Sequence, residues 1–310
     1  MAAAAGVSVT TASAALSRTG RVSESTRLKV QQAAQSLGYR ADTSARHLRA
    51  TTDTPPLIGM VFNPLVFQRR STFVSEFLMA LLDDLATEGI ALLQVTPKSR
   101  RALAGVPVDA LVVLTLTKQD LDPDLLGYGV PIIATHLSQA AHESVKAVLY
   151  HRYATIAEQS LDYLRQQGSQ QPALLRIGYD FVHINEITDS YQQWCREHDV
   201  EPRILTSDRD PDRVRAVVAK AQQEGADGFL DTIGAVGPIL DGLRNRSDVP
   251  IIAMSGDQAS QRLAPFIDLK PTECAHHLSQ TLLDLIRNTL PQNQRIIEMP
   301  YELRSEPLPD

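Results

Sequence analysis

The sequence is poor in cysteine and has no long apolar run. Its 310 residues include two cysteines, Cys195 and Cys274, whose positions show neither a pairing pattern nor a metal-ligand spacing. A disulfide scaffold and a zinc ribbon are therefore excluded. No apolar run reaches the roughly 18 residues that a membrane helix needs, and the N-terminus has no cationic stretch followed by an apolar block. We therefore expect a cytoplasmic protein without a membrane segment.

Features that carry catalysis are also scarce. The segment 234–238 (GAVGP) follows a predicted strand but has neither the GxGxxG nor the GxxxxGK pattern, so we interpret it as a helix start. His276 and His277 are adjacent and point to different sides of a helix, and no third ligand is spaced for zinc. No pair of nucleophile and base can be nominated. The sequence predicts a protein that is not an enzyme and uses no metal or other cofactor.

What the sequence does have is an ordinary globular composition and an uneven charge. Hydrophobic residues make up 43% and charged residues 21%, and the length corresponds to roughly two compact units. Residues 1–50 contain seven basic and two acidic groups, a net charge of +5, whereas the remaining 260 residues have a net charge of −11. A small basic head on a large acidic body indicates a polyanion-binding module joined to a domain with another task.

The body alternates short apolar runs with segments of helical period. Runs that are apolar on both faces are typical of a parallel sheet covered by helices. Apolar stripes at helical spacing occur at 73–85, 152–166, 186–198, 211–224 and 273–290. This alternation predicts a doubly wound α/β fold. The predicted strands are 57–62, 90–95, 109–116, 131–135, 173–178, 202–206, 227–231, 250–254 and 295–299.

An internal repeat predicts that the body has two lobes. Asp109 opens one strand and the pentapeptide VPIIA at 130–134 opens the next, while Asp227 and a second VPIIA at 249–253 do the same about 120 residues later. We therefore expect two similar lobes with a ligand cleft between them. The predicted boundaries are a head at 1–50, a linker at 51–56 and a body at 57–310, in which lobe 1 covers 57–150 plus 271–290 and lobe 2 covers 151–270 plus 291–310.

The head shows the start and stop signals of short helices. Gly6 can end a helix in the left-handed conformation, Ser8 can cap the next helix, and Ser23 can cap a third that runs from 24 to 37 and ends at Gly38. An organellar transit peptide has a similar composition, but it has no reason to carry ordered capping signals. A helix, a Gly turn and a second helix with exposed Thr and Ser predict a helix-turn-helix DNA reader.

Four sequence blocks carry a specific resemblance. They are AGVSxxTxSxxL at 5–16, VSExTR at 22–27, LGY at 37–39 and ARxLR at 45–49. In this order and spacing, the chain resembles the lactose-repressor/galactose-repressor family of bacterial transcription regulators. The resemblance implies an N-terminal all-α helix-turn-helix head on a periplasmic-binding-protein-like body of two doubly wound lobes, and it covers essentially the whole chain.

The resemblance also implies which residues contact DNA. Val9 and Thr10 match positions that read base edges, and Thr11 and Ser13 match positions that hold phosphates. The segment 43–49 matches the hinge helix, in which Leu48 is the wedge that enters the minor groove; the alternative is that Leu48 packs against the body. Ala14 stands where relatives often have Arg, so the head alone provides modest specificity. The full set of expected DNA contacts is Ser8, Val9, Thr10, Thr11, Ser13, Arg21, Ser23, Arg27, Tyr39, Arg46, Leu48 and Arg49.

The start of the chain departs from the family pattern. Relatives begin with about half a dozen further residues that form most of the first helix, whereas this sequence starts at Met1 near the end of that helix and leaves it only four alanines. Either the true start lies upstream of Met1 or the head is defective. We expect the first of these, a start codon set too far downstream.

The effector site departs from the pattern of sugar-responsive relatives. Thr135-His136, Ile187 and Ile233-Gly234 stand where those relatives have Asp, Arg and Asn-Asp groups for sugar hydroxyls. The candidate effector contacts are His136, Arg152, Tyr179, Asp231 and Asp257, a set compatible with a nucleoside, an anionic metabolite or no ligand. The sequence therefore predicts a homodimeric DNA-binding regulator of repressor type that binds palindromic double-stranded DNA and a small-molecule effector other than a simple neutral hexose. The alternatives are a solute-binding module and a degenerate regulator without DNA binding.

Overall fold

The computed structural model describes the chain except for residues 1, 18–21, 37–54, 63–71, 97–105, 107, 115–116, 118–122, 127–128, 137–143, 244–248, 255–257, 291–295 and 309–310. Its N-terminal part contains two short helices, α1 (Val9–Ser17) and α2 (Glu24–Ser36). Before α1, the amides of Gly6 and Val7 donate to the carbonyls of Ala3 and Ala2 (both 3.1 Å), with Gly6 at φ +66°. This is the Schellman ending of a preceding helical turn, as expected of a glycine at this position.

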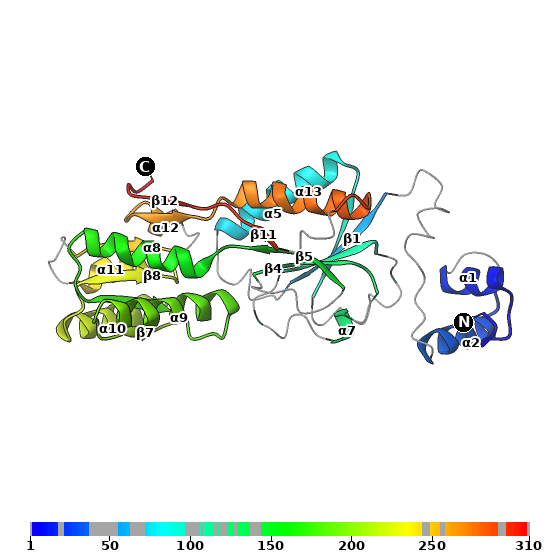
Figure 1. Ribbon diagram of the computed structural model, residues 1–310, viewed down its shortest axis with the longest axis horizontal. Helices are drawn as coiled ribbons and strands as arrows, with labels where there is room; N and C mark the ends of the chain where they lie inside the picture. The colour runs from blue at the N-terminus through cyan, green and yellow to red at the C-terminus, as the bar shows by residue number, and fades with distance from the viewer. Residues whose placement is uncertain are drawn as a thin grey trace.

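The first lobe is a parallel sheet in the order β11-β5-β4-β3-β1-β2. Helices α5 (Thr72–Thr87) and α13 (Pro271–Ile286) pack against each other over one face, and the short α7 (Pro123–Leu126) lies on the other (Figure 1). The strands are β1 (Leu57–Phe62), β2 (Ala91–Val95), β3 (Ala110–Leu114), β4 (Ile132–Thr135), β5 (Val145–Tyr150) and β11 (Ile296–Glu298).

The second lobe repeats this plan in the order β12-β10-β9-β8-β6-β7, with β12 antiparallel to β10. Helices α8 and α9 pack together, as do α10 and α11. The strands are β6 (Pro172–Arg176), β7 (Ile204–Thr206), β8 (Gly228–Asp231), β9 (Ile251–Ala253), β10 (Phe266–Asp268) and β12 (Glu302–Arg304). The helices are α8 (Tyr153–Gln166), α9 (Val182–Glu197), α10 (Pro211–Gln223), α11 (Val236–Gly242) and α12 (Gln258–Gln261).

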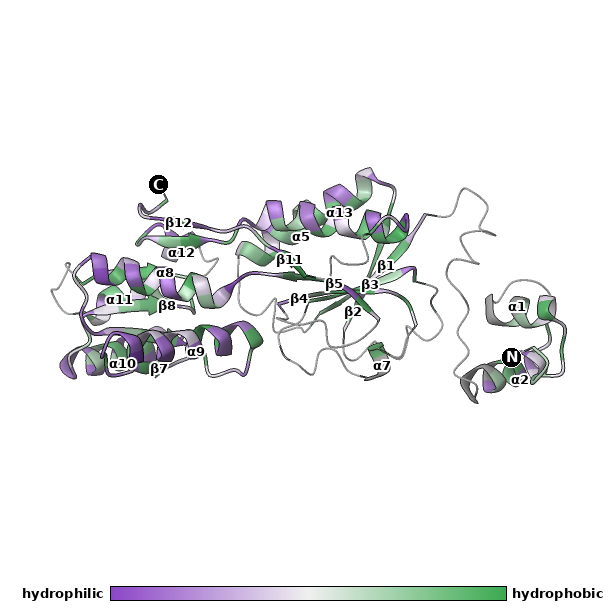
Figure 2. Cartoon of the chain, in the orientation of Figure 1, coloured by the Kyte–Doolittle hydropathy of each residue, from purple (hydrophilic) through white to green (hydrophobic). Residues whose placement is uncertain are grey.

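Hydropathy follows this layering. Most strands of both sheets are hydrophobic, except the edge strand β12, while α8, α9 and α10 alternate hydrophobic and hydrophilic residues along their length (Figure 2). Strand β3 is buried at every position, as a strand covered on both faces should be. The predicted α/β architecture of two parallel-sheet lobes is therefore confirmed. In the described ranges, no helix has the length and apolar character needed to cross a bilayer.

The chain passes three times between the lobes. The passages are β5 to α8, β10 to α13 and β11 to β12, and Figure 1 shows them side by side between the two sheets. The last passage corrects the boundary expected from the sequence, which assigned 291–310 to lobe 2. Ile296 pairs with Val148 of β5, so β11 extends the parallel edge of the first sheet, and only β12 belongs to the second.

The repeated aspartates have the same role in both lobes. Asp109 donates its amide to the Leu57 carbonyl and accepts the Leu57 amide at its carboxylate, both at 2.8 Å. Asp227 makes the same two-bond exchange with Gln171, at 3.1 and 2.7 Å, and also accepts from Ser169 Oγ. Each aspartate thus fixes the start of one central strand against its neighbour, which explains why the residue recurs in register.

We predict that Asp227→Ala lowers the free energy of unfolding of the body by about 2–3 kcal/mol, because the amides of Gln170 and Gln171 lose a charged acceptor. Urea unfolding followed by far-UV circular dichroism measures the loss. Replacement of the exposed Glu158 by Ala is the matched control and should change stability by less than about 0.5 kcal/mol. Equal losses in the two variants would contradict this role for Asp227.

Candidate DNA-binding head and interlobe site

The exposed face of α1 carries the residues expected to read DNA. Ser8 Oγ accepts the Thr11 amide at 3.0 Å and lies 2.8 Å from the Thr11 hydroxyl, so Ser8 caps the helix as predicted. Val9 is 72% exposed, and Thr10 next to it is also exposed. Because neither side chain is buried against the rest of the head, Val9 and Thr10 are accessible to a partner.

Helix α2 is capped in the same way. Ser23 Oγ accepts the Thr26 amide at 3.2 Å, and Arg27 pairs with Glu24 at 3.1 Å across one turn. The two helices contact each other through a small core of Ala12, Ala15 and Val30. The remaining expected DNA contacts lie outside the described residues or, for Ser13, outside the described side chains: Ser13, Arg21, Tyr39, Arg46, Leu48 and Arg49.

The candidate effector residues fall into separate environments. His136 follows β4, and its Nδ1 lies 3.1 Å from the Tyr153 hydroxyl. Arg152 lies at the surface, where it pairs with Glu298 at 2.8 Å and so joins two of the three passages between the lobes. Tyr179 is about half exposed and its ring contacts Phe181 (centroids 5.4 Å apart). Asp257 lies outside the described residues.

Asp231 lies at the C-terminal end of β8, as predicted, but its carboxylate is fully buried. It accepts the amides of Ile233 (2.9 Å), Gly234 (3.2 Å) and Ala235 (2.7 Å) in the turn before α11, where Gly234 has φ +74°. Burial raises the pKa of Asp231 to about 6, and these amides oppose the shift. In this structure Asp231 holds its own loop, and the segment 234–238 begins a helix, as expected.

Several rings that the sequence did not single out connect His136 to lobe 2. His136 lies against His151, Tyr153 and His183, with ring centroids 6.4, 5.8 and 5.7 Å away. Phe181 stacks on His183 at 5.8 Å. Three of the eight histidines of the chain thus meet at one place. Each sits in a different segment, so only the folded chain shows the cluster.

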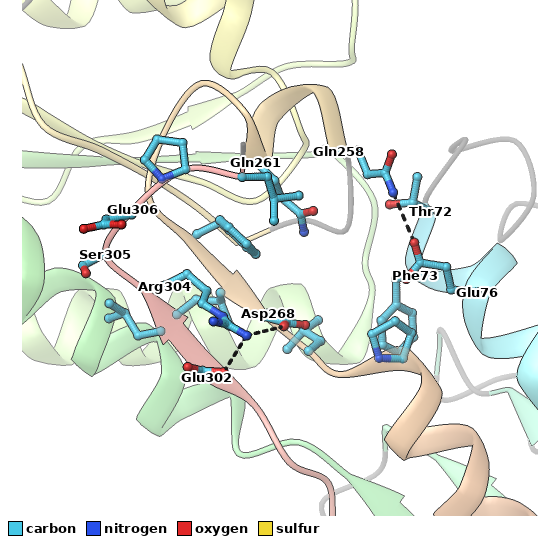
Figure 3. A pocket seen from close by; sticks show the side chains of 17 residues that line it. Thr72, Phe73, Glu76, Gln258, Gln261, Asp268, Glu302, Arg304, Ser305 and Glu306 are labelled. Carbon is cyan, nitrogen blue, oxygen red and sulfur yellow. Dashed lines mark hydrogen bonds and ion pairs between the residues drawn. The ribbon is translucent and has the colours of Figure 1, made fainter. Parts of the chain in front are cut away.

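A pocket of about 570 Å³ opens between the lobes near the third passage (Figure 3). Lobe 1 contributes Thr72, Phe73 and Glu76 from the start of α5, and the other lining residues come from α12, β10, the start of α13 and the segment that contains β12. Gln258 Nε2 donates to Glu76 Oε1 at 3.3 Å across the opening. Arg304 pairs with Glu302 (3.0 Å) and Asp268 (3.8 Å) on its wall.

The lining of this pocket contains carboxylates, amides, hydroxyls and one guanidinium beside apolar side chains, so it suits a polar ligand held between the lobes. No group of three or more His, Cys, Asp or Glu side chains suited to a metal ion occurs where side chains are described.

Comparison with known proteins agrees with these features. Residues 1–42 match the family model described as bacterial regulatory proteins, lacI family. Among curated proteins, no sequence matches the chain. Many solved structures share its fold, and three are representative.

The transcriptional regulator CelR in complex with cellobiose has a TM-score of 0.67 at 18% identity, covering 98% of both chains. The lac repressor dimer bound to operator and the anti-inducer ONPF has a TM-score of 0.66 at 18% identity, covering 99% of this chain and 98% of the other. A putative LacI transcriptional regulator from Bacillus cereus subsp. cytotoxis has a TM-score of 0.69 at 16% identity, covering 83% and 99%. Residues 1–42 therefore belong to the lacI family of bacterial regulatory proteins, and the chain has the fold of that family's regulators.

Proposed function

We propose that the protein is a transcription regulator of repressor type, which binds a palindromic DNA site as a homodimer and responds to a small molecule between its lobes. The observation that carries the proposal is the pair of N-capped helices within the segment that matches the lacI family, with Val9 and Thr10 turned outward, on a two-lobed body. A protein of this function acts on DNA without catalysing a reaction, and its place is the cytoplasm.

In this proposal α1 enters the major groove. The methyl groups of Val9 contact thymine methyls and the Thr10 hydroxyl bonds to a base edge. Thr11, Ser13 and the capped N-termini at Ser8 and Ser23 hold phosphates, helped by Arg21, Arg27 and Tyr39. Leu48 enters the minor groove from a hinge helix at 43–49, between Arg46 and Arg49. One relative of the same fold is a lac repressor dimer bound to operator.

Exposed apolar side chains on both lobes support the homodimer. Met79 is 68% exposed and shares a face of α5 with Leu82, one turn further on. On lobe 2, Leu240 of α11 and Leu263 beyond α12 are also exposed. In the proposed homodimer, the apolar face of α5 formed by Met79 and Leu82 would be covered by the second copy.

The interior of lobe 2 supports an effector other than a simple sugar. Ile187 and Ile233, which replace the polar groups that sugar-responsive relatives use, are both buried in the core of lobe 2. CelR, which has the same fold, was solved with cellobiose. We propose that this chain instead recognises a nucleoside or an anionic metabolite with His136, Arg152, Tyr179 and Asp257, whereas the buried Asp231 holds its own turn.

A solute-binding module is the rival function, because it has the same two lobes. It has no use for a basic head with two capped helices, so DNA binding separates the two functions. We predict that selection from random duplexes by the full chain enriches a palindrome that binds at least ~10³-fold more tightly than random DNA at equal salt. Thr10→Ala should relax the preferred sequence at one position of each half-site. Equal binding to the palindrome and to random DNA would favour the solute-binding module.

We predict that Leu48→Ala weakens binding to the selected palindrome and reduces its bend, because the wedge no longer holds an unstacked base step, which is worth a few kcal/mol. Gel phasing analysis measures the bend angle, and the melting temperature of the body should not change. An unchanged bend with a lower melting temperature would show instead that Leu48 packs against the body.

We predict that glucose, galactose and ribose bind weakly or not at all, since Ile187 and Ile233 are buried and offer no hydrogen-bond partner in place of the polar groups of sugar-responsive relatives, so sugar hydroxyl groups would be left unpaired at roughly 1–3 kcal/mol each. Isothermal titration calorimetry against these sugars, nucleosides and phosphorylated or carboxylated metabolites tests this. An anionic ligand should lose affinity in His136→Ala and in Arg152→Ala. Micromolar binding of a neutral hexose would contradict the assignment of the site.

A further inference from the structure

One buried histidine touches all three passages of the chain between the lobes. His151 lies in the first passage and is 2% exposed. Its Nε2 donates to the Leu269 carbonyl in the second passage at 3.3 Å and lies 3.6 Å from Cys274 Sγ at the start of α13. The Pro300 carbonyl of the third passage lies near the same ring and acts to raise its pKa. Any rotation of one lobe against the other must therefore change the surroundings of His151.

Around His151, rings from both lobes pack into one cluster, which we call the interlobe ring cluster: His136, His151, Tyr153, Phe181 and His183. His136 comes from lobe 1, and Phe181 and His183 come from lobe 2. Phe73 of α5 adds an edge contact to His151 at 6.3 Å. The contact between the lobes at this point thus consists of closely packed rings, of which three are imidazoles.

The charged groups around the cluster are engaged elsewhere. On α9, Glu186 bonds to the Tyr150 hydroxyl of β5. Arg152 and Glu298 pair with each other at the surface, and Lys270 in the second passage pairs with Asp268 and Glu302. On α5, Glu76 accepts from Gln258, and on α13 the nearest titratable group is the neutral thiol of Cys274.

We propose that the interlobe ring cluster is a proton-sensitive joint, which holds the two lobes in the present arrangement while its histidines are neutral and releases them when the histidines are protonated. A protonated imidazole packed among these rings has no hydrating water, so its charge is unfavourable there. In addition, the Tyr153 hydroxyl can donate to His136 Nδ1 only while that nitrogen is unprotonated. A fall in pH would thereby change the arrangement of the lobes that form the effector site.

The titration of the cluster has a definite sign. Burial, and secondarily the neighbouring His151, lowers the pKa of His136 to about 3. Burial lowers the pKa of His151 to about 4, although the carbonyls of Leu269 and Pro300 oppose the shift. Because each pKa lies below the ordinary value of about 6.5, the packed joint is most stable above pH 6.5 and loses stability as the pH falls toward 4. Glu186, whose pKa burial raises, titrates in the opposite sense.

The native cysteines report on the joint. Cys274 lies in the joint, whereas Cys195 is buried in the core of lobe 2 and serves as an internal control. The reaction rate of each thiol with 4,4′-dithiodipyridine, divided by the rate of free cysteine at the same pH, measures how often its site opens. Between pH 7.5 and 5.5 the normalised rate of Cys274 should rise about tenfold for each of His136 and His151, about a hundredfold in all, while that of Cys195 stays constant.

The variants separate the joint from general acid effects. His151→Phe and His136→Phe keep a ring in place, and each should remove about a tenfold part of the rise. His198→Phe, which alters a histidine stacked on Trp194 outside the joint, should leave the rise intact. Glu186→Gln should make the rise steeper. If a Phe variant does not fold, His136→Gln provides the same test.

Three results would overturn the proposal: a pH-independent rate at Cys274, a full rise in the His136→Phe/His151→Phe double variant, or a parallel rise at Cys195. The thiol assay does not involve DNA, so its result is independent of the function proposed above. Only the biological meaning of the joint rests on that function. A chain that passes this test but does not select a palindrome has the joint without the regulator function.

Discussion

The structure depends on one constraint, which is that two separately packed lobes are connected by three passages of the same chain. Each lobe has its own sheet and its own core, and Asp109 and Asp227 fix the starts of the central strands by identical hydrogen-bond exchanges. The arrangement of the lobes is therefore set where the passages meet, at His151, and by the few polar contacts that cross between them, such as Gln258 with Glu76. Small changes in these contacts act on the whole body, because the lobes themselves resist deformation.

This constraint explains how a body of this kind can control a head. Strand β1 begins at Leu57, shortly after the segment that matches the lacI family, so lobe 1 is the lobe that follows directly on the residues proposed to bind DNA. A ligand that binds one arrangement of the lobes more tightly shifts the population toward it, and DNA that prefers one arrangement does the same. The coupling is reciprocal, so the same free energy describes the effect of ligand on DNA and of DNA on ligand.

Much of the fold follows from the sequence, because strands buried on both faces are continuous apolar runs and the repeat of Asp with VPIIA marks equivalent strands. Three strands were missed for physical reasons: β5 exposes Lys146 within its apolar run, β10 has only three residues, and β12 is a three-residue antiparallel edge strand with two charged residues. The helix caps at Ser8 and Ser23 were predictable since capping is local. The ring cluster could not be predicted, since His136, His151 and His183 come together only when the lobes pack. Asp231 looked like a ligand contact because its three amide donors belong to a turn that sequence spacing does not reveal.

The central claim, that the arrangement of the lobes controls DNA binding, is tested most directly by fixing that arrangement. Glu76 and Gln258 face each other across the interlobe pocket, so a short bis-maleimide between Glu76→Cys and Gln258→Cys would hold the lobes as they are here (Figure 3). Affinity for the selected palindrome would then be measured from pH 7.5 to 5.5 with and without the crosslink. The account predicts an affinity that changes with pH in the free double variant and stays constant in the crosslinked protein. The same pH dependence in both would contradict it.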